Sequence, residues 1–344
     1  MAFYDRAFDA LGLREWCDGG ATGGPMTMAE LLARSRGEAA GDAPFSLPFP
    51  SLDNLHDACG AIPRTRDFTA AIEDGFLAAK DAIKVVLDPL TQPLSWALDG
   101  ALELFTWIPW WILIPLLVLA TWGASKSRGV TLFVALSFLF LGFVDHLDVA
   151  IQTLAIIFVC TTLCVLLGVP VGIAMSKRRG LRGSLTPVLD LLQTLPTFVY
   201  LIPLIFLFSV TESKLYGIAI ILYAIVPVIR LTDLGIRLVD PAVTEAADAF
   251  GMTPGQKLWK VELPLALPNI MAGINQTIMM SLAMVVIASL VSAPGLGVLV
   301  LRGIRNLELG VGLLAGVGIV LLAVMLDRAS KAALERVDRS EGNA

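Results

Sequence analysis

Charged and metal-binding residues are scarce in this sequence. Of its 344 residues only 16% are Asp, Glu, Lys or Arg, whereas soluble domains average about 25%. There are two histidines and four cysteines. The pattern G-x-x-x-x-G-K-[ST], the loop that cradles nucleotide phosphates in P-loop proteins, does not occur. These shortages exclude a soluble enzyme and an ATP-binding subunit, and we expect neither a metal nor a cofactor in this chain.

The hydrophobic residues, 56% of the chain, are gathered in long runs. Stretches of about 20 apolar residues can cross a bilayer as helices. The first stretch has tryptophans near both ends, as expected where amphipathic rings settle at the two headgroup layers. The sequence therefore predicts an all-α polytopic membrane protein with about seven transmembrane helices, near residues 107–122, 130–144, 149–175, 188–210, 215–229, 267–291 and 311–326.

Charge is distributed unevenly and predicts the orientation in the membrane. Residues 1–106 hold 8 Lys/Arg and 16 Asp/Glu and lack the basic and apolar regions of a secretory signal. The connections on one side of the spans, with the C-terminal tail, hold 14 basic residues, and those on the other side hold 3. Because Lys and Arg are retained in the cytoplasm, we expect a multi-pass protein of the bacterial inner membrane with a periplasmic N-terminus and a cytoplasmic C-terminus. Cys17 and Cys59 could pair in an oxidising periplasm, which the sequence leaves open.

The pattern of residues divides the chain into four regions. Residues 1–65 are rich in Gly, Ala, Pro and Asp without periodicity, so we expect a loosely ordered acidic extension. In 66–106 the apolar residues follow helical spacing, which favours an amphipathic helix at the membrane surface, with a helix of a small soluble subdomain as the alternative. The transmembrane domain occupies 107–326, and 327–344 form a cytoplasmic tail.

The cytoplasmic connection 230–264 is longer than a turn between two spans requires. Asp240 followed by Pro241 is an N-cap with proline in the first turn, and Gly251 stands where that helix would end. A capping-box pattern, Thr253-x-x-Gln256, starts a second short helix. Apolar residues share one face of the first helix at the spacing i, i+3, i+4 and i+7: Val243, Ala246, Ala247 and Phe250. Because so short a helix is marginal alone, we expect it to pack on its own chain or in a partner's groove.

This connection resembles the EAA loop of bacterial ABC importer permeases. The motif reads Glu245-Ala246-Ala247, then Gly251 and, after nine further residues, Val261-Glu262-Leu263-Pro264. Other stretches are similar to the permeases of glycine betaine and proline betaine importers, namely Gln193 to Leu201, Met271 to Thr277 and Ile319 to Arg328. The resemblance covers about residues 100–330.

The resemblance implies a type I ABC importer permease fold and a non-catalytic transport function. Besides the lipid bilayer, the implied partners are a second copy of the chain, cytoplasmic ATPase subunits that bind ATP and Mg, and a periplasmic solute-binding protein, with no nucleic acid. The implied solute is a betaine-type quaternary ammonium compound such as glycine betaine, proline betaine, choline or a related methylamine. The ATPase-coupling residues carried over are Glu245, Ala246, Ala247, Phe250, Gly251 and Pro264.

Polar and aromatic residues inside the spans are candidates for the translocation path. Polar groups at membrane depth are costly unless they pair or face a cavity. They could instead form hydrogen bonds between helices, worth about 1 kcal/mol or less each, and we give this interpretation the same weight. Aromatic faces suit a quaternary ammonium, which cannot shed its charge, although in the family the aromatic cage belongs to the binding protein, so core or lipid contact is the other interpretation. The polar candidates are Gln193, Thr194, Asn275, Gln276 and Thr277, and the aromatic ones Phe198, Tyr200 and Tyr223.

Glycines four residues apart predict close contacts between spans. Gly168 and Gly172 form one such pair, and Gly312 and Gly316 form another. Pro196 and Pro203 are expected to loosen the fourth span.

Two other classes of function remain as alternatives. The first is a secondary transporter or channel for small solutes, but the spans hold no ionisable relay beyond Asp190, and such relays are the usual mark of ion coupling. The second is a membrane-embedded enzyme, but both histidines lie outside the spans and no H-E-x-x-H occurs.

Overall fold

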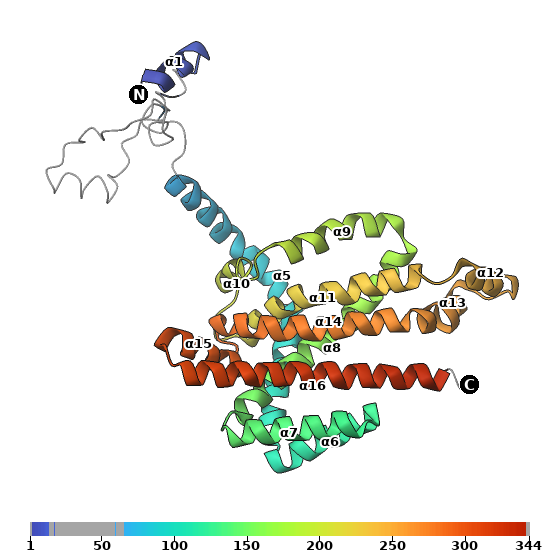
Figure 1. The fold of residues 1–344 in the computed structure, drawn as a ribbon. Coiled ribbons are helices and arrows are strands. Elements are labelled where there is room, and N and C mark those ends of the chain that lie inside the picture. Colours follow the sequence, from blue (N-terminus) through green and yellow to red (C-terminus); the bar gives the residue numbers. More distant parts are fainter. Residues whose placement is uncertain (1, 14–16, 18–58, 60–64, 342–344) are drawn as a thin grey trace. The chain divides into compact units, whose positions relative to one another are not determined.

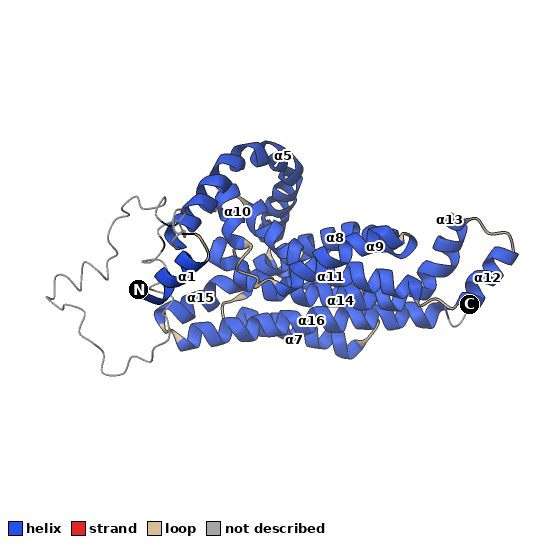
Figure 2. Ribbon diagram, turned by 90° about the horizontal axis from the view of Figure 1, so that it is seen from above, coloured by secondary structure: helices blue, strands red, loops and turns tan. Residues whose placement is uncertain are grey.

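The computed structural model describes residues 2–13, 17, 59 and 65–341. Every regular element within these ranges is helical, and none of them is a strand (Figure 2). The chain divides into two compact units, Met1–Ile83 and Lys84–Ala344. The predicted all-helical fold is confirmed.

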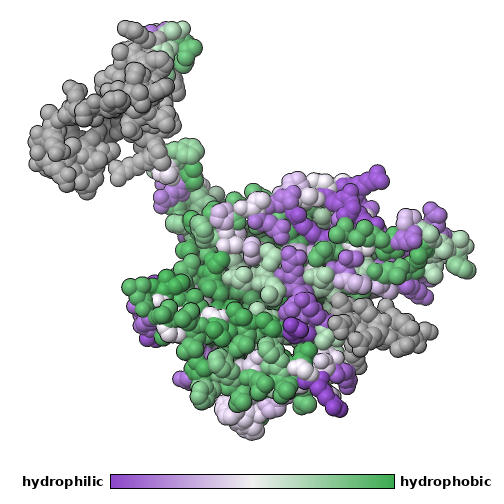
Figure 3. All heavy atoms as spheres, in the orientation of Figure 1, coloured by the Kyte–Doolittle hydropathy of each residue, from purple (hydrophilic) through white to green (hydrophobic). Residues whose placement is uncertain are grey.

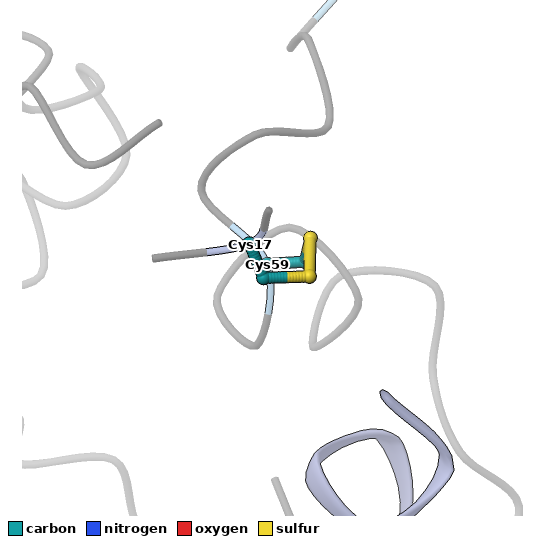
Figure 4. The surroundings of a disulfide bond; sticks show 2 residues. All are labelled: Cys17 and Cys59. Atoms are coloured by element: carbon teal, nitrogen blue, oxygen red, sulfur yellow. A yellow bond between two sulfur atoms is a disulfide. The ribbon is translucent and has the colours of Figure 1, made fainter. Parts of the chain in front are cut away.

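The first unit contains helix α1, Ala2–Ala10, and the beginning of helix α5, Thr65–Trp107. Cys17 and Cys59 form a disulfide in this unit, with their Cα atoms 4.5 Å apart (Figure 4). The pairing that the sequence left open is therefore made. Most of the predicted acidic extension, residues 1–65, lies outside the described residues. Helix α5 covers the segment predicted as an amphipathic helix, and its place at a membrane surface stays a prediction.

The helices of the second unit after α5 are α6 (Trp110–Ser125), α7 (Arg128–Phe143), α8 (Leu147–Lys177), α9 (Arg179–Thr194), α10 (Leu201–Leu207), α11 (Ser213–Arg237), α12 (Pro241–Ala249), α13 (Pro254–Lys257), η1 (Leu258–Glu262), α14 (Leu263–Ala288), η2 (Ser289–Val291), α15 (Leu296–Asn306) and α16 (Leu309–Glu341). Helices α8, α11, α14 and α16 lie side by side in a bundle (Figure 1). Figure 2 shows that the short helices α12 and α13 project beyond the ends of α11 and α14.

Four helical stretches are long and apolar enough to cross a membrane: Leu147–Lys177, Ser213–Arg237, Pro254–Val291 and Leu309–Ala332. A fifth is present if α5 and α6, which meet at an angle of 110°, are taken together as one span. By length and composition, the described residues thus hold four or five such stretches where the sequence predicted about seven. The predicted stretch 130–144 is the shorter apolar helix α7. The predicted stretch 188–210 is divided between α9 and α10, because Leu195, which precedes Pro196, is extended rather than helical.

The core of the bundle is where α8 and α14 pack against α11, and glycines allow the close approach. A Cβ atom added to Gly168 would lie 2.4 Å from Val228 Cγ1. One added to Gly172 would lie 2.6 Å from Thr232 Cβ and 2.7 Å from the carbonyl oxygen of Ile229. The predicted close contact at these two glycines is confirmed.

The second glycine pair behaves differently at its two members. Gly312 on α16 faces Gly303 on α15, whose own Cβ would lie 2.5 Å from Gly312 Cα. Around Gly316, by contrast, an added Cβ would meet nothing within 4 Å. The prediction of a close contact is thus right for Gly312 and wrong for Gly316, because only Gly312 lies against another helix of this chain.

The C-terminal part of α5 is joined to the start of α11 by charged and apolar contacts. Lys214, only 4% exposed, pairs with Asp88 at 2.7 Å and with Glu212 at 2.8 Å. An added Cβ on Gly217 would lie 2.5 Å from a methyl group of the fully buried Leu98. Lys214 is therefore held between two carboxylates at the point where the two helices meet.

Candidate functional site

The segment between α11 and α14 builds helix α12 from local signals. The Asp240 side chain accepts a hydrogen bond of 2.9 Å from the backbone N–H of Ala242, and Pro241 occupies the first turn. At the other end Gly251 has φ of +74°. The N–H of Gly251 donates to Asp248, and the N–H of Met252 donates to Ala247, which is the Schellman pattern of a helix end. The predicted start and end of this helix are confirmed.

Helix α13 begins with the predicted capping box. The backbone N–H of Gln256 donates to Thr253 Oγ1 at 3.4 Å, and Gln256 Oε1 accepts from the N–H of Thr253 at 3.0 Å. The turn continues into η1, which has π-helical hydrogen bonding and runs directly into α14. Lys257 pairs with Asp248 at 2.7 Å and so ties α13 to α12. Residues of the segment itself therefore cap both ends of α12 and the start of α13.

The apolar face of α12 is partly buried within the chain and partly exposed to solvent. Ala247 is 4% exposed, so it is packed within the protein. Val243, Ala246 and Phe250 remain exposed, Phe250 to 83%. The prediction placed both alanines on a docking face, but in this chain only Ala246 is available on the outside. We call Val243, Ala246 and Phe250 the α12 stripe.

The remaining predicted coupling residues differ in surroundings. Glu245 is exposed beside the α12 stripe, and Pro264 is half-buried in the first turn of α14. Glu262 of the same motif is buried and forms an ion pair with Lys177 at the end of α8. This pair, which the sequence analysis did not find, fixes the end of the segment to the bundle. No sequence signal could have matched two residues 85 positions apart.

The structure does not bring the predicted polar path residues together. Gln193 and Thr194 are exposed at the end of α9. On α14, Gln276 is exposed, while Thr277 is fully buried and its hydroxyl has no hydrogen-bond partner. These residues therefore lie on different faces of their helices.

Asn275 is held by α16. Its amide donates to Asp327 at 2.8 Å, and its oxygen accepts from the Ser330 hydroxyl at 2.8 Å. Such contacts are the interhelical hydrogen bonds considered as the alternative role for this residue.

The predicted aromatic residues also have separate surroundings. Tyr200 is buried, with its hydroxyl 3.8 Å from Met284 Sδ. Phe198 is 59% exposed, and Tyr223 on α11 is half-buried. Among the residues that the structure describes, no group of three or more His, Cys, Asp or Glu side chains could hold a metal ion.

A model of a known family matches residues 164–339, which include α9, α11, the α12–α13 segment and α14. The family is described as "Binding-protein-dependent transport system inner membrane component". The chain belongs to this family. The family prediction made from the EAA-like motif is thereby confirmed.

Two relatives named as transport permeases match most of the chain. The glycine betaine transport system permease protein OpuAB of Bacillus subtilis is 40% identical over 258 residues, which are 75% of this chain and 90% of the relative. The glycine betaine/proline betaine transport system permease protein ProW of Escherichia coli is 41% identical over 259 residues, 75% of this chain and 72% of the relative.

The inner-membrane component fold is also found among solved structures. A chain of the MetNI methionine ABC transporter, solved in inward-facing conformations, aligns with a TM-score of 0.50 and 22% identity, covering 56% of this chain and 95% of that one. This likeness supports the permease fold. The N-terminal residues up to 163 lie outside the family match.

Proposed function

We propose that this chain is the membrane subunit of an ATP-driven importer for betaine-type quaternary ammonium solutes such as glycine betaine, proline betaine, choline or a related methylamine. The observation that carries the proposal is the identity of about 40% to two permeases named for glycine betaine transport, over three quarters of the chain. A secondary transporter or channel, the alternative, has no comparable support.

ATP hydrolysis in this proposal takes place in a separate subunit. The sequence has no P-loop pattern, and a binding-protein-dependent transport component needs a partner that supplies energy. The partner ATPase would hold ATP and Mg, a periplasmic solute-binding protein would deliver the solute, and this chain would neither catalyse a reaction nor carry a cofactor. Two copies of the chain would enclose the path, so that two coupling segments meet two ATPase subunits.

The α12 stripe is the proposed contact with the ATPase. It is apolar and exposed at the tip of a segment that projects from the bundle. The caps of α12 and α13 satisfy the segment's own backbone, so a partner would meet a formed helix and would not have to order one. Gly251 shapes this helix end, while Glu245 and Pro264 flank the contact. Ala247 supports it from within the chain.

The proposed orientation has the α12–α13 segment and the C-terminus in the cytoplasm and the N-terminus in the periplasm. It rests on the distribution of basic residues, 14 on one side against 3 on the other, and this count requires seven crossings with α7 as one of them. The disulfide between Cys17 and Cys59 suits the same orientation, because disulfides persist in the oxidising periplasm.

The experiment that tests the proposal enlarges Ala246, since that residue is exposed whereas Ala247 is not. The variant Ala246→Trp should fold and insert normally, because its side chain points away from the bundle. It should hold the α12 stripe off the partner's groove. We therefore expect both co-elution of a tagged ATPase subunit and ATP hydrolysis stimulated by glycine betaine and the binding protein to fall, each by about fivefold or more. Overpacking of about 1–3 kcal/mol corresponds to this range.

The matched control is Ala246→Ser, which adds a single oxygen and should retain both activities. Wild-type co-elution and stimulated hydrolysis in Ala246→Trp would mean that this stripe is not the coupling contact. A wild-type complex that hydrolyses ATP without response to any betaine would contradict the proposed solute class.

A further inference from the structure

Helices α15 and α16 form a hairpin at one end of the bundle. A Cβ added to Gly318 of α16 would lie 3.3 Å from a methyl group of Leu296, at the start of α15. A Cβ added to Gly303, near the end of α15, would lie 2.5 Å from Gly312 Cα. The two helices therefore run side by side in opposite directions, and residues 304–309, which join them, are the outermost part of the hairpin. We call these residues the α15–α16 turn.

The start of α15 is fixed to two other elements of the bundle. The buried hydroxyl of Thr153 on α8 accepts a hydrogen bond of 2.9 Å from the backbone N–H of Leu296. A Cβ added to Gly295, which has φ of +117°, would collide with the same hydroxyl. A Cβ added to Gly297 would collide with Ser289 Oγ of η2. The helix that carries the α15–α16 turn is thus anchored where no further side chain fits.

The α15–α16 turn also has its own contacts. The carboxylate of Glu308 accepts from Arg302 Nε at 3.0 Å and from the amide of Asn306 at 3.0 Å. Its carbonyl oxygen accepts from the N–H of Gly312 at 3.1 Å. Between these contacts Leu307 has φ of +58°, which is unusual for a bulky residue and persists only where the surroundings determine it. Leu307 is therefore held in a strained conformation by a formed turn.

The strained residue protrudes from a surface that is both apolar and charged. Leu307 is 89% exposed, and its neighbours Ile304 and Leu309 are 66% and 74% exposed. Arg305 and Asn306 are exposed beside them, and Arg305 has no ion-pair partner within the part of the chain that the structure describes. Figure 3 shows hydrophobic and hydrophilic residues together at the place that α15 has in Figure 1. An apolar centre with a polar rim is typical of a protein–protein contact.

The α15–α16 turn and the α12–α13 segment lie at opposite ends of the bundle (Figure 1). The single spanning stretch Pro254–Val291 begins at α13 and ends just before α15. If the α12 stripe contacts the ATPase, the α15–α16 turn is on the other side of the membrane. The family description states that transport depends on a binding protein, and that protein delivers its solute on the side away from the ATPase.

We propose that the α15–α16 turn is a docking contact for the solute-binding protein. Leu307 enters an apolar recess of the binding protein, and Arg305 meets carboxylates at the rim of that recess. Because the turn is already formed and α15 is anchored, little conformational freedom is lost on docking. This inference rests on the proposed function, which supplies both the partner and its side of the membrane.

The first test measures how much binding protein the transporter needs. In the complete transporter in lipid nanodiscs, ATP hydrolysis is recorded against the concentration of the binding protein of the same system, loaded with glycine betaine. Leu307→Ala keeps the Cβ atom and removes the protruding part of the side chain. It should raise the half-saturating concentration at least tenfold, because a central apolar residue leaves the contact. Arg305→Glu should raise it at least threefold by repelling carboxylates.

The matched control makes the same change at another exposed leucine. Leu313 is 60% exposed on α16, within the spanning stretch Leu309–Ala332, so Leu313→Ala should keep the wild-type half-saturating concentration. Leu307→Asn separates docking from folding, because Asn tolerates positive φ and relieves the strain. It should need at least tenfold more binding protein. Wild-type behaviour of Leu307→Ala or of Leu307→Asn would overturn the proposal.

The second test identifies the molecule that touches the turn. A photoreactive benzophenone amino acid at position 307 should crosslink to the loaded binding protein, whereas the same group at position 313 should crosslink to lipid. Crosslinks from position 307 to lipid alone, with saturating binding protein present, would show that the turn lies in the membrane interface and would contradict the docking contact.

Failure of the proposed function would give a different result. If binding protein loaded with glycine betaine stimulated no hydrolysis in the wild-type transporter at any concentration, the proposed solute class would be wrong. The crosslink from position 307 to the binding protein, formed or not formed, would still decide whether the α15–α16 turn is the docking contact.

Discussion

The helices of the core around α11 and those of the projecting α12–α13 segment are stabilised by different kinds of contact. In the core, glycines let α8 and α14 approach α11 so closely that no side chain could be added, as at Gly172 beneath Thr232. In the α12–α13 segment, stability comes from caps at Asp240, Gly251 and Thr253, while an apolar stripe stays exposed. The core therefore depends on contacts with distant residues, and the projecting segment depends on residues a few positions away. Substitutions can measure this difference.

The largest effect is expected in the core. Gly172→Leu places a side chain against Thr232 and against the carbonyl oxygen of Ile229, which is backbone and cannot turn aside. Overpacking costs about 1–3 kcal/mol or more, and we expect most of the protein to be lost on purification in detergent, with a lower unfolding temperature for the rest. Gly316→Leu, where an added Cβ meets nothing within 4 Å, is the matched control and should purify normally. Equal yields would mean that the core is loosely packed.

An intermediate effect is expected where the two regions join, at Lys177 and Glu262. The two side chains differ in exposure, 41% for Lys177 and 7% for Glu262. Lys177→Met strands a buried carboxylate and should destabilise more than Glu262→Gln, which leaves a half-exposed ammonium in water. The loss for Lys177→Met should fall between the about 1 kcal/mol of an exposed pair and the about 3–5 kcal/mol of a fully buried one.

The measurement for this junction is thermal unfolding of both single variants and of Lys177→Met/Glu262→Met. The double variant should regain stability relative to Lys177→Met, because no buried charge is left unpaired. If Glu262→Gln proved the more harmful change, the asymmetry inferred from burial would be wrong.

The smallest effect on stability is expected in the projecting segment. Gly251→Val puts a β-branched residue at φ of +74°, which costs roughly 1 kcal/mol or more, whereas Gly251→Asn should cost less because Asn tolerates this conformation. Hydrogen exchange should quicken in α12 and leave the core amides unchanged. Faster exchange spreading into α11 would show that the two regions are not independent.

Sequence reasoning succeeded where structure is determined locally. The caps of α12 and α13 depend on residues within a few positions, and each was found at its predicted place. The close approach at Gly168 and Gly172 followed from composition on one face of a helix. The side of α12 that turns inward could not be predicted, because Ala246 and Ala247 have the same size and only contacts with the rest of the chain distinguish them.

Contacts between residues far apart in the chain could not be predicted from the sequence either. The hydrogen bonds of Asn275 go to residues 52 and 55 positions away, and the Asp190–Arg230 pair joins helices separated by 40 positions. Apolar content suggested a continuous fourth span, but the extended residue before Pro196 divides it. That proline was expected to loosen the helix, and its local effect proved stronger.

The burial of Lys214 determines how the attachment of α5 to α11 responds to ionic strength. Dissolved ions shorten the reach of electrostatic attraction to about 3 Å at 1 M, but they act mainly on charges that water surrounds. The exposed pair Arg302–Glu308, with side chains 57% and 34% exposed, should weaken as salt is added. Lys214, whose side chain is 5% exposed between Asp88 and Glu212, should keep its partners. Concentrated electrolyte would then leave α5 attached to the bundle.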